Sequence, residues 1–514
     1  MGTFTTELTF GQYAYGTMAE SPNISYKTLL YSYDLIASLF LSGAPGFWTD
    51  IQGTPQLYTD TAGTTAATWG DAVALVLDKS KGLVLGPELV TNGTFDSNIN
   101  GWTTQGSTTA VWSNGAALIN NVVAGTWFAE NFRLSTPILT VGQTYEMRFS
   151  ARNVSGTASL RVANNAAPIL DIPSLPSSFQ SYRLIFTCAV TNTFSFFKNG
   201  NTGEFELDNI SVKLLPGNHL AQATAGNRPV YARHPKTGIR NLLVQTDTLS
   251  TQSVTVTAAA HTLSFKGTGT VTLSGTSTAG PLVGTGAGNR VTLTFTPTAG
   301  TLTLTVSGSV TEAQLELGSS ATAYQKVTGW YDVTESGVPS VPYLYFNGTS
   351  TSMATSAIDF SAGDKMTVFA AVRKLSDAAR GMLVELGVSP ASGAFRLEAP
   401  GGAASNYVVA TGGSSQTSAT ATPYAAPITS IITGIGSIST DQCVIRVNGS
   451  QAASSASDQG TGNYSNNPLY IGSRGGSGLY FKGNFYDLAI VAAELPVATI
   501  AAVETKLNST VGAY

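Results

Sequence analysis

The chain has 514 residues, which is too long for one hydrophobic core and predicts two to four domains. Only 11% of its residues are charged, against about 25% in ordinary soluble domains, and the net charge is -4. Since it has no cluster of lysine and arginine, the sequence excludes the basic footprint of a nucleic-acid-binding protein and of a protein that binds anionic lipid.

The N-terminus lacks the basic start and apolar run of a secretory signal. The most apolar stretch, residues 29–41, is too short to span a bilayer and contains Asp34. We therefore expect a soluble chain that is made without export. The two cysteines, Cys188 and Cys443, lie about 255 positions apart in apolar stretches, which favours two buried thiols over a disulfide.

The first predicted element is a helix over residues 25–42, which Gly43 and Pro45 end. Its apolar residues recur at spacings of three and four, at Leu29, Leu30, Tyr33, Ile36, Leu39 and Phe40. Little other sequence is available to cover this apolar face, so residues 1–50 are predicted to form an attachment or oligomerisation segment.

Almost everything after residue 50 indicates short strands bounded by Gly, Asn, Pro and Ser, which predicts an all-β fold of several jelly-roll sandwiches. Further predicted strands carry Val254 and Val256, Leu263 and Phe265, and Val271 and Leu273. The clearest alternation is in residues 290–310, where Val291, Leu293 and Phe295 and then Leu302, Leu304 and Val306 face one way. The turn at Ala299 and Gly300 predicts that these two runs form a hairpin. At the C-terminus, Pro496 and the apolar spacing of Ile500, Val503 and Leu507 predict a short helix.

Three groups of segments resemble known families. GPELVTNGTFDSNINGW at 86–102 and GEFELDNISVKLL at 203–215 resemble the opening and closing runs of carbohydrate-binding jelly rolls of the family 4, 9 and 22 type. NLLVQTDTLS and EAQLELGSSATAYQKV, near the two ends of 241–328, resemble small jelly-roll modules of phage head-spike, fibre and tail proteins. The resemblances imply a carbohydrate-binding module at 83–216 and a phage-type module at 241–328.

The remaining segments resemble successive parts of a concanavalin A-like, laminin-G-type sandwich. They include residues 57–80, 217–231 and 343–355, LYIGSR, FKGNFYDLAI and the final helix. The resemblance implies one outer sandwich, residues 51–82, 217–240 and 329–514, interrupted by the two modules. The run TDTAGTTAATWGDAVALVLDKS also resembles structural proteins of phages and prophages, which implies a component of a virion surface.

The strongest candidate for chemistry is the strand GEFELDNI, whose period of two places Glu204, Glu206 and Asp208 on one face. Paired carboxylates perform glycoside hydrolysis, but a solvated strand face explains the same pattern. The carbohydrate-binding-module resemblance implies a third alternative, a structural calcium bound by Asp208 together with Asp96 or carbonyl groups of residues 92–95.

Sugar recognition stacks aromatic rings on the apolar face of a sugar. In the 83–216 module the candidate rings are Trp112, Trp127, Phe128 and Tyr182, whereas Trp102 is predicted to lie in the core. In the outer sandwich, Tyr407, Tyr424 and Tyr464 lie in Gly-, Ser- and Asn-rich surroundings, and we expect them to be exposed. For each single aromatic residue, a place in the core remains the alternative.

Together these features favour a non-enzymatic phage virion protein, such as a head fibre or spike, a capsid decoration or a tail-fibre component, that displays glycan-binding sandwiches for host attachment. Its expected partners are other virion proteins, a host-surface glycan and further copies of itself. No cofactor is required, and a structural calcium is expected only under the alternative that the carbohydrate-binding-module resemblance implies. The alternatives are a virion-associated polysaccharide depolymerase and a free adhesin encoded by a prophage.

Overall fold

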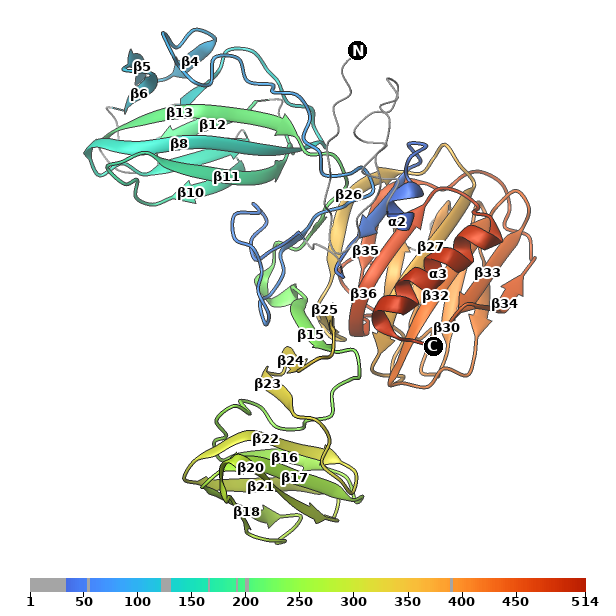
Figure 1. Ribbon diagram of the computed structural model, residues 1–514. Helices are drawn as coiled ribbons and strands as arrows, with labels where there is room; N and C mark the ends of the chain where they lie inside the picture. The colour runs from blue at the N-terminus through green and yellow to red at the C-terminus, as the bar shows by residue number, and fades with distance from the viewer. Residues whose placement is uncertain are drawn as a thin grey trace, which may run out of the picture.

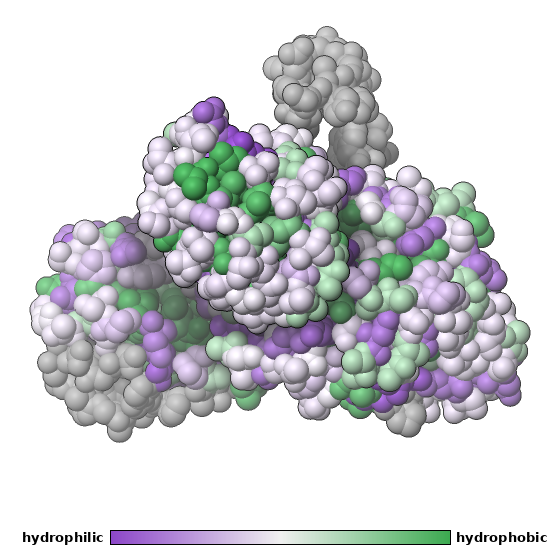
Figure 2. All heavy atoms as spheres, turned by 90° about the horizontal axis from the view of Figure 1, so that it is seen from below, coloured by the Kyte–Doolittle hydropathy of each residue, from purple (hydrophilic) through white to green (hydrophobic). Residues whose placement is uncertain are grey.

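The computed structural model describes residues 34–52, 56–121, 131–164, 167–190, 193–198, 203–388 and 392–514. Within these ranges the strands form six sheets, which pair into three β-sandwiches (Figure 1). The predicted all-β fold is therefore confirmed. The face seen in Figure 2 is dominated by residues of near-neutral hydropathy, as expected of a chain with so few charged side chains.

The largest sandwich, here called the outer sandwich, combines a ten-stranded and a nine-stranded sheet. In order, the ten-stranded sheet contains β23 (Gln325–Gly329), β24 (Asp332–Glu335), β15 (Val230–Pro235), β25 (Ser340–Asn347), β36 (Lys482–Val491), β27 (Lys365–Lys374), β32 (Ile428–Ser437), β33 (Gln442–Val447) and β34 (Ser450–Ser455), with β1 (Gly46–Thr49) paired to β36. The nine-stranded sheet contains β2 (Leu57–Tyr58), β3 (Leu75–Val76), β14 (Leu220–Ala221), β26 (Met353–Asp359), β35 (Asn466–Ile471), β28 (Met382–Leu386), β29 (Ala394–Glu398), β30 (Tyr407–Gly412) and β31 (Thr417–Ala421).

The two sheets of the outer sandwich enclose one apolar core, and a helix covers the outer face of the larger sheet. Along β29, Phe395 and Leu397 point into the core and the alternate residues point away, as the pleat of a strand requires. Helix α3 (Val497–Val511) buries Ile500, Val503 and Leu507 against the ten-stranded sheet (Figure 1). The predicted C-terminal helix is confirmed, and Gly512 ends it in a left-handed conformation.

The second sandwich, here called the first module, has two five-stranded sheets around a core that includes Trp102 and Cys188. One sheet contains β10 (Ala167–Ile172), β9 (Leu160–Asn164), β12 (Ser195–Lys198), β7 (Asn131–Leu134) and β4 (Trp102–Gln105). The other contains β11 (Gln180–Thr187), β8 (Thr144–Gly156), β13 (Gly203–Leu214), β6 (Ala116–Asn121) and β5 (Thr108–Ser113). Trp102 stacks on Phe132, so the prediction of a core indole is confirmed. Cys188 and, in the outer sandwich, Cys443 are buried and form no disulfide, as predicted.

The third sandwich, here called the second module, has a four-stranded sheet of β16 (Gln252–Val256), β21 (Gly300–Ser307), β18 (Thr270–Gly275) and β19 (Leu282–Val283). Its three-stranded sheet contains β20 (Gly286–Phe295), β17 (His261–Gly267) and β22 (Val310–Leu317). The predicted hairpin of residues 290–310 is wrong, because β20 pairs with β17 while β21 pairs with β16 and β18. Both inner faces of a sandwich need alternating apolar residues, so the pattern does not reveal that the chain changes sheets at Gly300.

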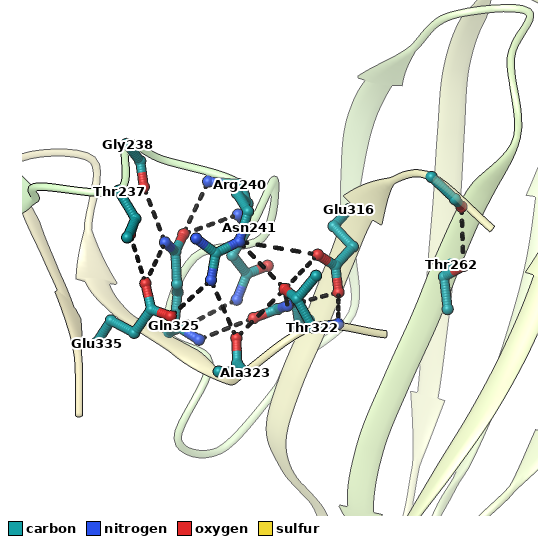
Figure 3. A network of polar contacts seen from close by, with 12 residues as sticks. Thr237, Gly238, Arg240, Asn241, Thr262, Glu316, Thr322, Ala323, Gln325 and Glu335 are labelled. Carbon is teal, nitrogen blue, oxygen red and sulfur yellow. Dashed lines mark hydrogen bonds and ion pairs between the residues drawn. The ribbon is translucent and has the colours of Figure 1, made fainter. Parts of the chain in front are cut away.

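A polar network joins the second module to the outer sandwich (Figure 3). Arg240 forms an ion pair of 2.7 Å with Glu335 on β24 and donates to Oγ1 of Thr322. Gln325 donates from Nε2 to Glu335 and to the carbonyl of Gly238, and its Oε1 accepts from the backbone N–H of Arg240. This network connects the segment that enters the module with the segment that leaves it.

The first module contacts the outer sandwich through the outer face of β11. Arg183 donates from Nη1 to the carbonyl of Gly63 at 3.0 Å, and the backbone N–H of Ile185 donates to Ala62. Ile185 is buried with Tyr58 and Leu75 in a small apolar cluster. Strands that precede and follow each module in the sequence lie side by side in one sheet of the outer sandwich, since β3 pairs with β14 and β14 with β26. The exact domain boundaries remain a prediction.

Residues 34–50 are the described part of the predicted attachment segment, and they form a short helix and one strand of the outer sandwich. The helix α2 (Leu35–Ser38) begins after Asp34, whose extended backbone and side chain cap it, so Asp34 does not lie inside a helix. Ile36 and Phe40 pack on the ten-stranded sheet, so the apolar face that was expected to be uncovered is covered for these residues. Gly46–Thr49 form β1 of that sheet. Residues 25–33 of the predicted helix lie outside the described residues.

Candidate functional site

The prediction that Tyr407 and Tyr464 are exposed is wrong. Their side chains are 0% and 1% exposed, in the core of the outer sandwich. The hydroxyl of Tyr407 bonds to Ser430 at 3.0 Å, and the hydroxyl of Tyr464 bonds to Thr411. Tyr424 is half-buried and its ring lies 5.3 Å from that of Tyr407. Gly- and Ser-rich surroundings were misleading because small residues also pack closely around large buried rings.

The aromatic candidates of the first module have different outcomes. Trp112 on β5 is 44% exposed, and its Nε1 donates to the carbonyl of Phe95 at 2.6 Å, so it remains available as a stacking residue. Tyr182 on β11 is half-buried and stacks on the core residue Phe149, which occupies one face of its ring. Trp127 and Phe128 lie outside the described residues.

The acidic strand of the first module has the predicted orientation. Phe205 and Leu207 point into the core, so Glu204 and Glu206 lie on the outer face of β13. Glu206 is buried and forms a 2.7 Å ion pair with Arg152, whose guanidinium lies 4.9 Å from the centre of the exposed ring of Phe179.

Glu204 and Glu206 are held by neighbouring groups. Glu204 accepts from Asn120 Nδ2 and Ser155 Oγ, both at 3.1 Å. Glu206 accepts from Ser113 Oγ at 3.0 Å as well as from Arg152. The two carboxylates therefore organise a polar sheet face rather than stand free as an acid and a base.

Asp208 and Asp96, the two carboxylates of the calcium prediction, lie in the same neighbourhood. Burial raises the pKa of Asp208, and the negative charges of Asp96 and Glu206 raise it further. Calcium takes six to eight oxygen ligands. The oxygens of Asp208 already accept two bonds from Asn209, and the carbonyl of Phe95 accepts from an indole N–H.

Within the described part of the chain, no group of three or more His, Cys, Asp or Glu residues is placed to hold a metal ion. As arranged, Asp96 and Asp208 do not complete a calcium shell. The calcium site remains a prediction that rests on these two carboxylates.

The outer face of the nine-stranded sheet carries a row of directly opposed residues across five strands. In strand order the row is Tyr470 on β35, Glu385 on β28, Arg396 on β29, Ala410 on β30 and Ser418 on β31. Tyr470 is half-buried and Ser418 is exposed. An aromatic ring, a carboxylate, a guanidinium and a hydroxyl are the groups that a sugar-binding face combines.

Charged side chains next to the row complete this face. We call it the sheet-C face, where sheet C is the nine-stranded sheet. Glu398 on β29 bonds to Arg380 and to Arg396, and Arg396 also donates to Gln416. Arg474 forms a 3.2 Å ion pair with Glu385. The two glutamates are buried, and the arginine side chains are 14–32% exposed. The guanidinium groups therefore form the solvent-facing layer over the acids.

No pattern in the sequence identifies the sheet-C face. Its residues come from strands up to about 90 positions apart, with nothing between them that resembles a motif. The only local indication is Arg396 and Glu398, polar residues that alternate with core residues in AFRLE.

The fold defines a class of protein, a β-sandwich protein with three sandwiches in the described residues. Residues 347–501, which contain all residues of the sheet-C face, match the family described as the concanavalin A-like lectin/glucanases superfamily. A search of curated proteins finds no match. The described residues contain no helix both long and apolar enough to cross a bilayer.

Three of the solved structures that are similar to the chain are named here. They are the CBM40 module of a Ruminococcus gnavus IT-sialidase bound to α2,3-sialyllactose (13% identity, 29% of this chain and 97% of that one, TM-score 0.24), the CBM22-1 xylan-binding domain of Xyn10C from Paenibacillus barcinonensis (12%, 26% and 97%, 0.22), and the heptameric SAP-like pentraxin of Limulus polyphemus (12%, 31% and 80%, 0.27).

Proposed function

We propose that this chain is a non-enzymatic carbohydrate-binding protein, and that the sheet-C face of its outer sandwich is a glycan-binding surface. The observation that carries the proposal is the row from Tyr470 to Ser418, which lies within the residues that match the lectin/glucanase superfamily. Partly exposed arginine side chains next to a half-buried ring suit hydroxyl and carboxylate groups of a sugar.

The superfamily description includes glucanases, so binding must be distinguished from hydrolysis. A glycosidase needs one carboxyl group that gives up a proton and a second that attacks or activates water. Glu398 instead accepts hydrogen bonds from two arginines, and Glu385 from one. Since these bonds occupy the carboxylate oxygens, the arrangement supports recognition rather than acid–base catalysis.

Glycan-array binding of the purified full chain tests this proposal. Arg396→Ala should weaken binding about tenfold or more, the loss expected when a charged hydrogen bond is removed. Arg148→Ala is the matched control, because it removes an exposed guanidinium from the first module. Equal binding by both variants would remove the sheet-C face from the proposal. Release of shorter glycans by the wild type would favour a depolymerase.

We further propose that the chain is displayed on a phage particle and attaches it to a host glycan. The support is the resemblance of residues 59–80 and 241–328 to phage structural proteins, together with a surface of uncharged polar residues. Mass spectrometry of purified virions should find the chain in particles, associated with other virion proteins. Its recovery only from the soluble lysate would instead favour a free adhesin.

A further inference from the structure

A cavity of about 140 Å³ lies between α3 and the ten-stranded sheet, on the opposite side of the outer sandwich from the sheet-C face. We call it the α3 cavity. The sheet contributes Trp48 from β1, Ala371 from β27 and Asp487 from β36. The helix contributes Leu507 and Val511. The remaining lining residues are Asp34, Ile36, Asp50, Gln52, Lys506 and Thr510.

Asp487 reaches this cavity because β36 has a bulge. Ala371 pairs with Asp487 and Val372 with Phe485, so Tyr486 is the extra residue of β36. A bulge redirects the side chains that follow it. Oδ1 of Asp487 accepts from Thr49 Oγ1 at 3.1 Å and from the backbone N–H of Leu488 at 2.8 Å. A carboxyl group is thus fixed beneath a helix in the middle of a large sheet.

Two polar atoms of the lining have no hydrogen-bond partner. Nε1 of Trp48, whose side chain is 5% exposed, donates to nothing, and Oε1 of Gln52 accepts nothing. The amide of Gln52 is fixed from its other end, because Nε2 donates to the carbonyls of Pro342 and Tyr486. Buried polar groups are nearly always paired, so an unpaired donor and an unpaired acceptor at one cavity indicate a ligand.

The charge at the cavity limits the kind of ligand. Asp50 forms a 2.6 Å ion pair with Lys79. Burial and the charge of Asp50 raise the pKa of Asp487 well above its usual range. Asp34 and Lys506 add one charge of each sign at the lining. A neutral ligand with both donors and acceptors fits these groups better than an anion.

We propose that the α3 cavity binds the vicinal diol of a small polyhydroxyl ligand, either a free polyol or the terminal sugar residue of a glycan. A hydroxyl group can accept from Trp48 Nε1 and donate to Gln52 Oε1, since it carries both functions. An adjacent hydroxyl bonds to Asp487. The volume of about 140 Å³ suits a ligand of this size, because it is several times the space that a single water molecule needs.

The test is a titration of the full chain followed through the indole N–H resonances in ¹H–¹⁵N spectra. The probes are glycerol and myo-inositol for free polyols, and methyl glycosides of glucose and galactose for the end of a glycan. The Trp48 resonance, assigned with Trp48→Phe, should shift and saturate. The resonance of Trp330, which is 65% exposed, is an internal control and should not shift with it.

Gln52→Met keeps the size of the side chain and removes the acceptor, so it should weaken the response about tenfold. Saturation by polyols alone identifies a free polyol as the ligand, whereas saturation by the glycosides identifies a glycan end. No saturable Trp48 shift with any probe means that the cavity holds only water and overturns the proposal. The wild-type titration decides this even if the variant does not fold.

Arg396→Ala should leave the Trp48 response unchanged. The proposal for the α3 cavity and the proposal for the sheet-C face can therefore be contradicted independently of each other.

Discussion

The backbone N–H of Asp78 donates to Nδ1 of His219 over 2.9 Å, which joins the chain before the first module to the chain after it. Because Nδ1 accepts this bond, the imidazole is neutral and carries its proton on Nε2. The carboxylate of Asp78 accepts from the backbone N–H groups of Trp48, Ser80 and Asn218. Residues 78–80 and residues 217–219 thus meet in one buried polar joint.

This joint predicts a pH dependence of folding. Burial lowers the pKa of His219 to about 4, below the value of about 6.5 in an unfolded chain. Between these values the unfolded state binds more protons, so the stabilisation is present above pH 6.5 and is lost as the pH falls towards 4. We expect about 2 kcal/mol to be lost between pH 7 and pH 5.

His219→Asn keeps an acceptor for the Asp78 N–H and removes the titration. Urea unfolding at the two pH values should show a smaller difference for this variant than for the wild type. Equal differences would assign the pH dependence to other groups, such as His234, whose pKa burial also lowers.

The ion pair of Arg240 and Glu335 should stabilise the attachment of the second module. Both side chains are largely buried, at 27% and 6% exposure, and the pair is part of a larger network. Arg240→Met, Glu335→Gln and the double variant form a thermodynamic cycle with an expected coupling of about 1 kcal/mol. The readout is thermal unfolding, with limited proteolysis near residues 236–241. A coupling near zero would show that the other bonds of the network suffice.

Helix α3 should contribute directly to the stability of the outer sandwich. Ile500→Ala removes a side chain that is 2% exposed and should cost about 2–5 kcal/mol, since a buried cavity remains. Thr505→Ala on the exposed face of the same helix is the control and should change stability by less than about 0.5 kcal/mol. Chemical unfolding followed by fluorescence compares the two, and similar effects would contradict the packing of α3 on the sheet.

Tyr407→Phe separates core residues from glycan-binding residues. The variant leaves the hydroxyl of Ser430 without its buried partner and should cost about 1–2 kcal/mol of stability. Glycan binding should not change, because the ring is completely buried. A loss of binding at unchanged stability would return Tyr407 to the candidate binding residues.

The sequence by itself determined the fold class, because the strand alternation that predicts it is a local property. It also determined the C-terminal helix, the buried cysteines and the orientation of Glu204 and Glu206, each of which follows from a period of two or of three to four residues. Periodicity says which face a residue occupies and not which strand lies beside it. For this reason the alternation of residues 290–310 does not show that its two runs lie in different sheets.

Only the tertiary structure decided which polar residues meet. The sheet-C face joins Tyr470 to Glu385 across two strands, and the α3 cavity joins Trp48 to Asp487. Both pairs are separated by many residues whose side chains give no sign of the contact. The tertiary structure also decided which aromatic side chains are exposed. Tyr407 and Trp112 lie in similar local sequence, but only Trp112 lies on the edge strand of its sheet. Burial depends on what the rest of the chain packs against a residue, and a single segment does not contain that information.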